Sequence, residues 1–184
     1  MLAVAERFAD MFIDPEEDPR ADASLTGGEG EVLAGFLKWQ RDTLKLKCAG
    51  LDAEQLARKP VPTSNLSLLG LVRHLAEVER SWFRIVLAGE NAPAHFITKD
   101  DPDLDFTGVQ PDPDMVIAAW DAWHYEVANA EKFVAEHPLD ATGNEPWRGP
   151  VALRWVLVHM VEEYARHNGH ADLLREAIDG AVGQ

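Results

Sequence analysis

The sequence of 184 residues has one cysteine, few basic residues and no long apolar run, and each shortage excludes a class of protein. Its cysteine, Cys48, has no partner in the chain for a disulfide, which fits a reducing compartment. Only 17 lysines and arginines stand against 32 aspartates and glutamates, and the formal net charge is −15. Binding to phosphate backbones or anionic lipids needs a basic patch, so we expect no nucleic-acid partner and no membrane partner.

The apolar stretches are also much shorter than the roughly 20 residues that span a bilayer. The N-terminal residues MLAVAERFADMFIDPEEDPR lack the basic segment and apolar core of a secretory signal, so we expect a cytoplasmic protein. The length suits a single domain over residues 1–184. We divide it into an N-terminal arm (1–25), in which residues 5–12 form a short helix or strand, a helical bundle (26–178) and a tail (179–184).

Apolar residues at helical spacing predict four long helices and no convincing strand. The first follows a capping box from Thr26 to Glu29 and ends near Cys48. Serines before Leu68 offer N-caps for the second, and an N-cap aspartate followed by proline starts the third. The second, third and fourth helices are expected over 68–87, over 113–136, and from Gly149-Pro150 through 155–176.

These helices predict an all-α fold, a four-helix bundle. Residues 88–111 contain several prolines and aspartates and form the longest irregular stretch. Direct antiparallel neighbours need only short loops, so we expect this stretch to be a long crossover between the second and third helices. The connector 51–62 is expected to contain one short helical turn before Pro60.

The inward face of the fourth helix is too polar for a bundle core. At 100° per residue, a stripe centred on Glu163 carries three histidines in its middle and apolar residues at both ends. Burying such groups without partners is costly, so the stripe requires either a hydrogen-bond network or a bound metal ion. The positions within about 60° of Glu163 are Ala152, Val156, His159, Met160, Arg166, His167, His170 and Leu174.

Glu163 and His167 lie one helical turn apart, a spacing at which two side chains can share one ion. His74 lies near the middle of the second helix, which a bundle can place against the inner face of the fourth. Small residues on its side of the helix, Gly70 and Ser81, would leave room next to the imidazole. Two histidines and one carboxylate form a ligand set of catalytic zinc sites, where a fourth position stays open to water or substrate.

Other assignments of the ligands remain open. After Glu163 with His167, our second choice on the fourth helix is His167 with His170, and our third is His159 with Glu163. His159 is equally a candidate for supporting a ligand or lining the pocket. Without a metal, the same side chains would form a buried polar network.

Several other reactive or charged residues receive weaker assignments. Arg73 and Arg166 lie beside candidate ligands and either hold anionic groups of a substrate or, as the simpler interpretation, form surface salt bridges. Cys48 lacks the basic surroundings that a reactive thiolate needs. The histidines to which we assign no role are His95, His124 and His137.

Three blocks of the sequence resemble the DinB-like four-helix bundle proteins. They are Lys38-Trp39-Gln40-Arg41 with Gly50-Leu51, then SLLGLVRHLAEVERSWF from Ser67 to Phe83, and HMVEEYARHNGHADLLR from His159 to Arg175. The resemblance covers about residues 26–178, and the last two blocks are specific in combination. In particular, the chain resembles the actinobacterial-type branch, which includes mycothiol-dependent transferases and is related to the mycothiol-dependent maleylpyruvate isomerase.

The resemblance implies a divalent metal, zinc first and nickel as the alternative, held by one histidine of the second helix and two residues of the fourth. Many members carry His-x-x-x-His on the fourth helix, whereas the isomerase-like branch has glutamate at the first position, as Glu163 is here. His74, Glu163 and His167 therefore inherit the ligand roles, and the departure from three histidines leaves the metal's identity open. His170 falls where many relatives have glutamine. The family name refers to damage induction, but nothing in this acidic chain supports DNA binding.

Such relatives transfer or use low-molecular-weight thiols. The resemblance thus implies a thiol-dependent S-transferase or isomerase in which a metal-bound thiolate attacks an electrophilic substrate, with mycothiol as the expected thiol. The irregular stretches 88–111 and 138–149 are expected to shape the pocket, and a homodimer remains open. Two alternatives remain: a metal-dependent hydrolase that activates water at the same site, and a non-catalytic, metal-free bundle with a buried His/Glu network.

Overall fold

The computed structural model describes residues 12–14 and 16–183, and four long helices form most of it. The predicted all-α bundle is confirmed, with one small β-hairpin in addition. The short element expected at residues 5–12 lies outside the described residues except for Phe12. The elements are α2 (Glu29–Cys48), α3 (Ala53–Ala57), α4 (Leu68–Glu79), the π-helical segment η1 (Arg80–Leu87), α5 (Leu104–Thr107), α6 (Pro113–Glu136), β1 (Thr142–Glu145), β2 (Gly149–Ala152) and α7 (Leu153–Asp179).

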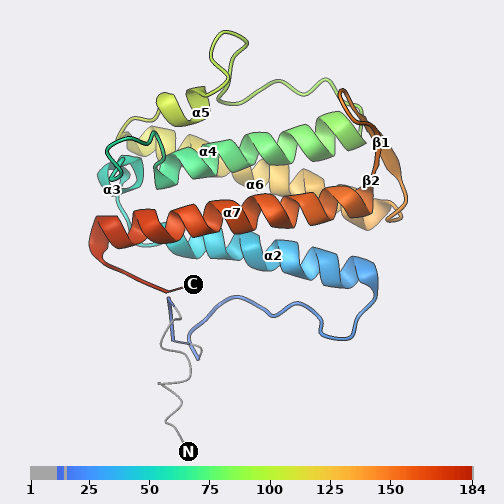
Figure 1. Ribbon diagram of the computed structural model, residues 1–184, viewed down its shortest axis with the longest axis horizontal. Helices are drawn as coiled ribbons and strands as arrows, with labels where there is room; N and C mark the ends of the chain where they lie inside the picture. The colour runs from blue at the N-terminus through green and yellow to red at the C-terminus, as the bar shows by residue number, and fades with distance from the viewer. Residues whose placement is uncertain (1–11, 15, 184) are drawn as a thin grey trace, which may run out of the picture.

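The bundle consists of two pairs of helices, since α2 packs along α7 and α4 packs along α6 (Figure 1). After η1 the chain returns along the outside of α4, forms α5 and then enters α6 in the same direction as α4 (Figure 1). The expected crossover between the second and third long helices is therefore confirmed. The hairpin of β1 and β2 lies at one end of the bundle, before α7 (Figure 1).

Two of the expected helix starts are confirmed, and two are wrong. The Ser67 hydroxyl accepts the amide N–H of Gly70 at 3.1 Å, and the Asp112 side chain caps α6. The capping box at Thr26 is not formed, because α2 begins at Glu29 with Gly28 as its N-cap. Glu29 thus occupies the first helical position, from which it cannot play the third-position role of a capping box.

The start expected for the last helix at Gly149-Pro150 is also wrong. These residues begin β2, which pairs antiparallel with β1 from Glu145 opposite Gly149 to Thr142 opposite Ala152. Gly149 has φ +81°, a left-handed conformation that suits the tight turn of a hairpin and not the start of a helix. Helix α7 begins only after the hairpin, at Leu153.

The apolar faces of the four helices meet in one core, in which most side chains are almost completely buried. The largest buried rings are those of Trp123 on α6 and Tyr164 on α7. Among the helices of the described residues, none has the combination of length and apolar character that crossing a membrane requires. Aliphatic residues with no measurable exposure include Leu44, Leu69, Leu75, Leu153, Leu157 and Met160.

Candidate metal centre

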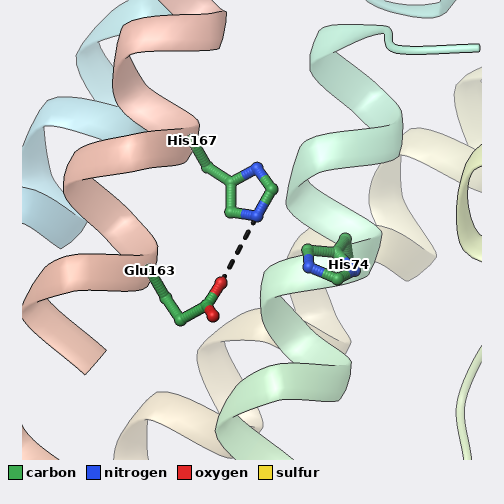
Figure 2. A group of neighbouring side chains, drawn as sticks. All are labelled: His74, Glu163 and His167. Carbon is green, nitrogen blue, oxygen red and sulfur yellow. Dashed lines mark ion pairs between the residues drawn. The ribbon is translucent and has the colours of Figure 1, made fainter. Parts of the chain in front are cut away.

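The side chains of His74, Glu163 and His167 lie close together between α4 and α7 (Figure 2). One potential ligand atom from each residue can be chosen so that all lie within 4.8 Å of one another. His167 Nε2 lies 3.5 Å from Glu163 Oε2. Two atoms that each lie about 2.1 Å from a tetrahedral ion are about 3.4 Å apart, so this separation fits ligands that share one ion.

A buried carboxylate orients the His74 ring. His74 Nδ1 lies 2.9 Å from Oδ2 of Asp105, whose side chain is only 4% exposed. An ionised carboxylate can only accept, so Nδ1 is the donor of this hydrogen bond and Nε2 is left as the nitrogen that could bind a metal ion. Histidines that bind metals commonly donate their other N–H to a carboxylate in this way. Sequence reasoning did not single out Asp105, because it is one of many aspartates in a stretch without helical spacing.

Asp105 is held in place because α4 fixes the crossover at several points. Arg73 donates a hydrogen bond to the carbonyl oxygen of Leu104 at 2.8 Å. Glu77 Oε1 accepts the backbone N–H groups of His95 and Phe96 at 2.7 and 2.6 Å. Arg73 is buried, so both roles predicted for it, a contact to substrate and a surface salt bridge, are wrong. It fixes the loop that carries Asp105.

The space expected beside His74 at Gly70 is already occupied by this loop. A Cβ atom on Gly70 would lie 3.0 Å from the ring of Phe106, which leaves little room for a side chain there. The Phe106 ring packs against the imidazole of His74, with 4.8 Å between their centroids. Gly70 therefore allows the crossover to pack closely against α4 beside His74, and does not leave space for a ligand there.

Burial, and after it the positive charge that the nearby His74 and His170 can carry, together lower the pKa of His167 to about 4. At neutral pH the imidazole is thus uncharged and offers a lone pair, which is the form that binds metal ions. His170 Nδ1 lies 3.4 Å from His167 Nδ1. His170 therefore approaches the Nδ1 side of the His167 ring, whereas Glu163 approaches its Nε2 side.

The alternative ligand His159 also approaches the cluster. Its Nε2 lies 3.6 Å from Glu163 Oε1, and its Nδ1 lies 3.4 Å from Glu162 Oε2. Arg166 pairs with Glu162 at 3.4 Å, and both side chains are 60% exposed, so the simpler interpretation of Arg166, a surface salt bridge, is confirmed. The assignment of the ligands themselves stays a prediction.

The histidines without an assigned role lie away from the three side chains of Figure 2. His95 Nε2 lies 2.7 Å from the buried carboxylate of Glu126. The His124 ring packs against Trp120 and Trp123 on α6, and His137 stacks on Phe133 at the end of that helix.

A second polar cluster crosses the core and links all four long helices. Arg41 on α2 donates two hydrogen bonds of 2.7 Å to the carboxylate of Glu79 on α4. Tyr164 on α7 donates to Glu79 at 2.8 Å and accepts the indole N–H of Trp123 on α6 at 2.8 Å. Burial alone would lower the pKa of Arg41, but the charge of Glu79, the hydrogen bonds to it and the contributions of Tyr164 and Glu131 together outweigh burial and raise the pKa. We call these four residues the closed network, and His74, Glu163 and His167 the open cluster.

Comparison with known proteins adds evidence that is independent of this geometry. Residues 32–180 match the family model described as mycothiol-S-transferase. Curated proteins gave no match. Among solved structures, the chain is similar to a conserved protein from Enterococcus faecalis with a TM-score of 0.59 and 16% sequence identity, covering 84% of this chain and 99% of that one. At this identity the likeness concerns the fold alone.

Proposed function

Because this chain belongs to the mycothiol-S-transferase family, we propose that it is a divalent-metal-dependent enzyme that joins mycothiol, through its sulfur, to an electrophile. The observation that carries the metal dependence is the open cluster, in which two imidazoles and a carboxylate from α4 and α7 converge. We assign zinc as the preferred ion and nickel as the alternative, because imidazole suits both and a carboxylate is an accepted third ligand.

The donor set fits such an ion on three counts. Asp105 fixes the tautomer of His74, and His167 is uncharged at neutral pH. Glu163 supplies a negative charge that partly neutralises a divalent cation. A cation held there would supply positive charge next to the sulfur of an incoming thiol and lower its pKa. The side chains of His74, Glu163 and His167 are 25%, 22% and 11% exposed, so the cluster can be reached from solvent.

The nucleophilic sulfur has to come from a co-substrate. Cys48 is the one cysteine of the sequence, and its side chain is buried in the core. Burial raises the pKa of its thiol to about 12, so almost no thiolate forms at neutral pH. This argument supports an external thiol and fits a protein that works in the reducing cytoplasm, where such thiols are abundant.

The reaction that follows is a simple group transfer. The thiol gives its proton to solvent, and its sulfur forms a C–S bond with the electrophilic carbon. In a substitution, the leaving group departs with the electron pair of the bond that breaks. The roles of the protein are to hold His74, Glu163 and His167 in fixed orientations and to keep the thiol and the electrophile adjacent.

The test is conjugation of mycothiol to monobromobimane by metal-loaded protein. We expect the protein to accelerate formation of the fluorescent conjugate. This acceleration should require both the metal and mycothiol. Cysteine serves as the comparison thiol, and the variant Cys48→Ala should keep the activity. A hydrolase using the same site would consume a hydrolysable electrophile equally well without mycothiol, and that result would reject the transferase assignment.

A further inference from the structure

An aromatic cluster lies directly beside the open cluster, toward the hairpin end of α7. It consists of Trp82 on η1 with Trp155 and His159 on α7. The ring centroids are 4.7 Å apart for Trp82 and His159, 5.4 Å for Trp82 and Trp155, and 5.1 Å for Trp155 and His159. His159 connects the two clusters, since its Nε2 lies 3.6 Å from Glu163 Oε1.

The π-helical segment explains why Trp82 faces α7. Along a regular α-helix, the eight residues from His74 to Trp82 would turn the side chain about 80° away from the direction of His74. From Arg80 onward the helix is a π-helix, which has more residues per turn and hence less rotation per residue. The smaller rotation brings Trp82 back toward the face of His74. Both side chains accordingly contact α7, His74 at His167 and Trp82 at His159.

The aromatic cluster is not part of the core. Trp155 is 40% exposed, whereas Trp123, a core tryptophan, is 2% exposed and uses its indole N–H within the closed network. Beyond Trp155 a groove of about 810 Å³ follows the surface, with Val151 and Val158 among its apolar lining residues. The charged side chains of Glu29, Arg148 and Arg154 also line this groove, and the guanidinium of Arg148 lies 5.6 Å from the centre of the Trp155 ring. Partly exposed rings that continue into such a mainly apolar groove are suited to bind a small ligand with an apolar body and polar substituents.

The shape of the rings selects a class of ligand. The rings of Trp155 and His159 are stacked and nearly parallel, with 18° between their planes, and Trp82 meets His159 edge-on at 68°. A flat π-system gains affinity from stacking or edge contacts with such rings, which an aliphatic group of the same size does not. His159 lies one turn from Glu163 and Trp155 about two turns, so a single-ring molecule held against His159 would lie within reach of the open cluster.

We infer that Trp82, Trp155 and His159 form the subsite for the electrophile, and that it selects planar aromatic or conjugated molecules over aliphatic ones. This inference rests on the proposed function for its reaction, but the binding of a planar molecule does not depend on that function. With 1-chloro-2,4-dinitrobenzene as the electrophile, the C–S bond forms while the C–Cl bond breaks and chloride leaves with its electron pair. Trp82, Trp155 and His159 act by positioning the ring.

Binding is measured first, by titrating metal-free protein with the unreactive planar probe 1,3-dinitrobenzene and following tryptophan fluorescence and calorimetric heat. We expect Trp155→Ala to weaken binding about 3- to 10-fold, the range given by loss of one stacking contact. Trp147→Ala is the matched control, because Trp147 is 86% exposed on the hairpin and makes no ring contact among the described residues. Equal dissociation constants for the two variants would overturn the inference.

Kinetics then separate the subsite from the reaction. With mycothiol and metal present, Trp155→Ala should raise KM for 1-chloro-2,4-dinitrobenzene about 3- to 10-fold and leave kcat for this electrophile nearly unchanged. For the aliphatic electrophile iodoacetamide, kcat/KM should change little. Equal losses for both electrophiles would reject the subsite and leave the transferase assignment intact. A third outcome is that 1,3-dinitrobenzene binds in a way that depends on Trp155 but neither electrophile is converted. That outcome would support the subsite and reject the proposed function.

Discussion

The closed network and the open cluster both draw side chains from α4 and α7, and Tyr164 of one follows Glu163 of the other in sequence. In the closed network the four hydrogen bonds are 2.7 or 2.8 Å long, and Arg41, Tyr164 and Trp123 each donate to an acceptor within the network. In the open cluster the contacts to Glu163 are 3.5 and 3.6 Å, too long for charge-assisted hydrogen bonds. Both are groups of polar side chains in the interior of the bundle, yet only the closed network has short hydrogen bonds between all of its members.

This difference distinguishes a network whose hydrogen bonds are satisfied within the fold from a cluster that could still accept an ion. A buried polar network stabilises a fold when every member is satisfied, and the closed network meets that condition. Glu163, the uncharged His167 and the oriented Nε2 of His74 offer lone pairs to one another. A divalent cation would satisfy all three at once. Four predictions test this contrast, from the largest expected effect to the smallest.

Breaking the closed network should cost the most stability. Glu79→Ala removes the carboxylate that neutralises buried Arg41, and we expect the free energy of unfolding to fall by about 3–5 kcal/mol in urea titrations. The loss should be the same with metal and with chelator. Glu131→Ala is the control, since Glu131 also faces Arg41, at 3.8 Å, but is 59% exposed; its removal should cost at most about 1 kcal/mol. Similar losses for the two variants would show that the network is not closed.

Metal should stabilise the protein only through the open cluster. At a free zinc concentration 100-fold above Kd, the free energy of unfolding of the wild type should rise by about 2.7 kcal/mol. Glu163→Ala should remove this increment, whereas Glu162→Ala, at the adjacent and 60% exposed position, should keep it. Denaturation curves with zinc and with chelator provide the measurement. A metal increment that survives in Glu163→Ala would exclude Glu163 as a ligand.

Asp105 should tune the affinity of the site without providing a ligand. Asp105→Asn removes the charge that orients His74, and we expect zinc to bind about 10- to 100-fold more weakly in competition with a chelating dye. Asp103→Asn changes an exposed carboxylate in the same loop and should leave the affinity unchanged. An unaltered affinity in Asp105→Asn would mean that His74 keeps its orientation by other contacts.

The last prediction concerns the pH dependence of the metal-free protein. The pKa of His167 is lowered to about 4 in the folded chain, from an ordinary value of 6.5. As the pH is lowered, His167 therefore takes up a proton in the unfolded chain before it does so in the folded chain. The stability that the uncharged His167 contributes at neutral pH is lost as the pH falls from about 6.5 to about 4. His167→Gln should flatten the stability curve in this range, and His124→Gln, on the exposed side of α6, should not. Parallel curves for the two variants would contradict the assigned cause of the shift.

The sequence predicts well what depends on local spacing. Periodic apolar residues placed the four long helices, and Ser67 and Asp112 marked two of their starts, because a cap needs only its own backbone neighbours. The approach of His74 to Glu163 and His167 was also foreseeable, since a bundle must bring its inward faces together. Those inward positions follow from the 3.6-residue period alone.

Features that depend on distant packing were not predictable. Gly149 looks like a helix start until the hairpin partner β1 is known, and the turn to π-helix at Arg80 has no signal in the sequence. The role of Asp105 depends on the crossover being held by Arg73 and Glu77, contacts that join residues far apart in the chain. The sequence thus indicated which side chains meet in the bundle, but not the loop residues that orient them.

The most direct test of the open cluster as a metal site is the metal content of purified protein, measured by elemental analysis after reconstitution with zinc and removal of excess ion. We predict one equivalent per chain for the wild type and none for His74→Ala, with the same far-ultraviolet circular dichroism in both. Wild-type protein that retains no zinc or nickel, or His74→Ala that retains one equivalent, would contradict the assignment.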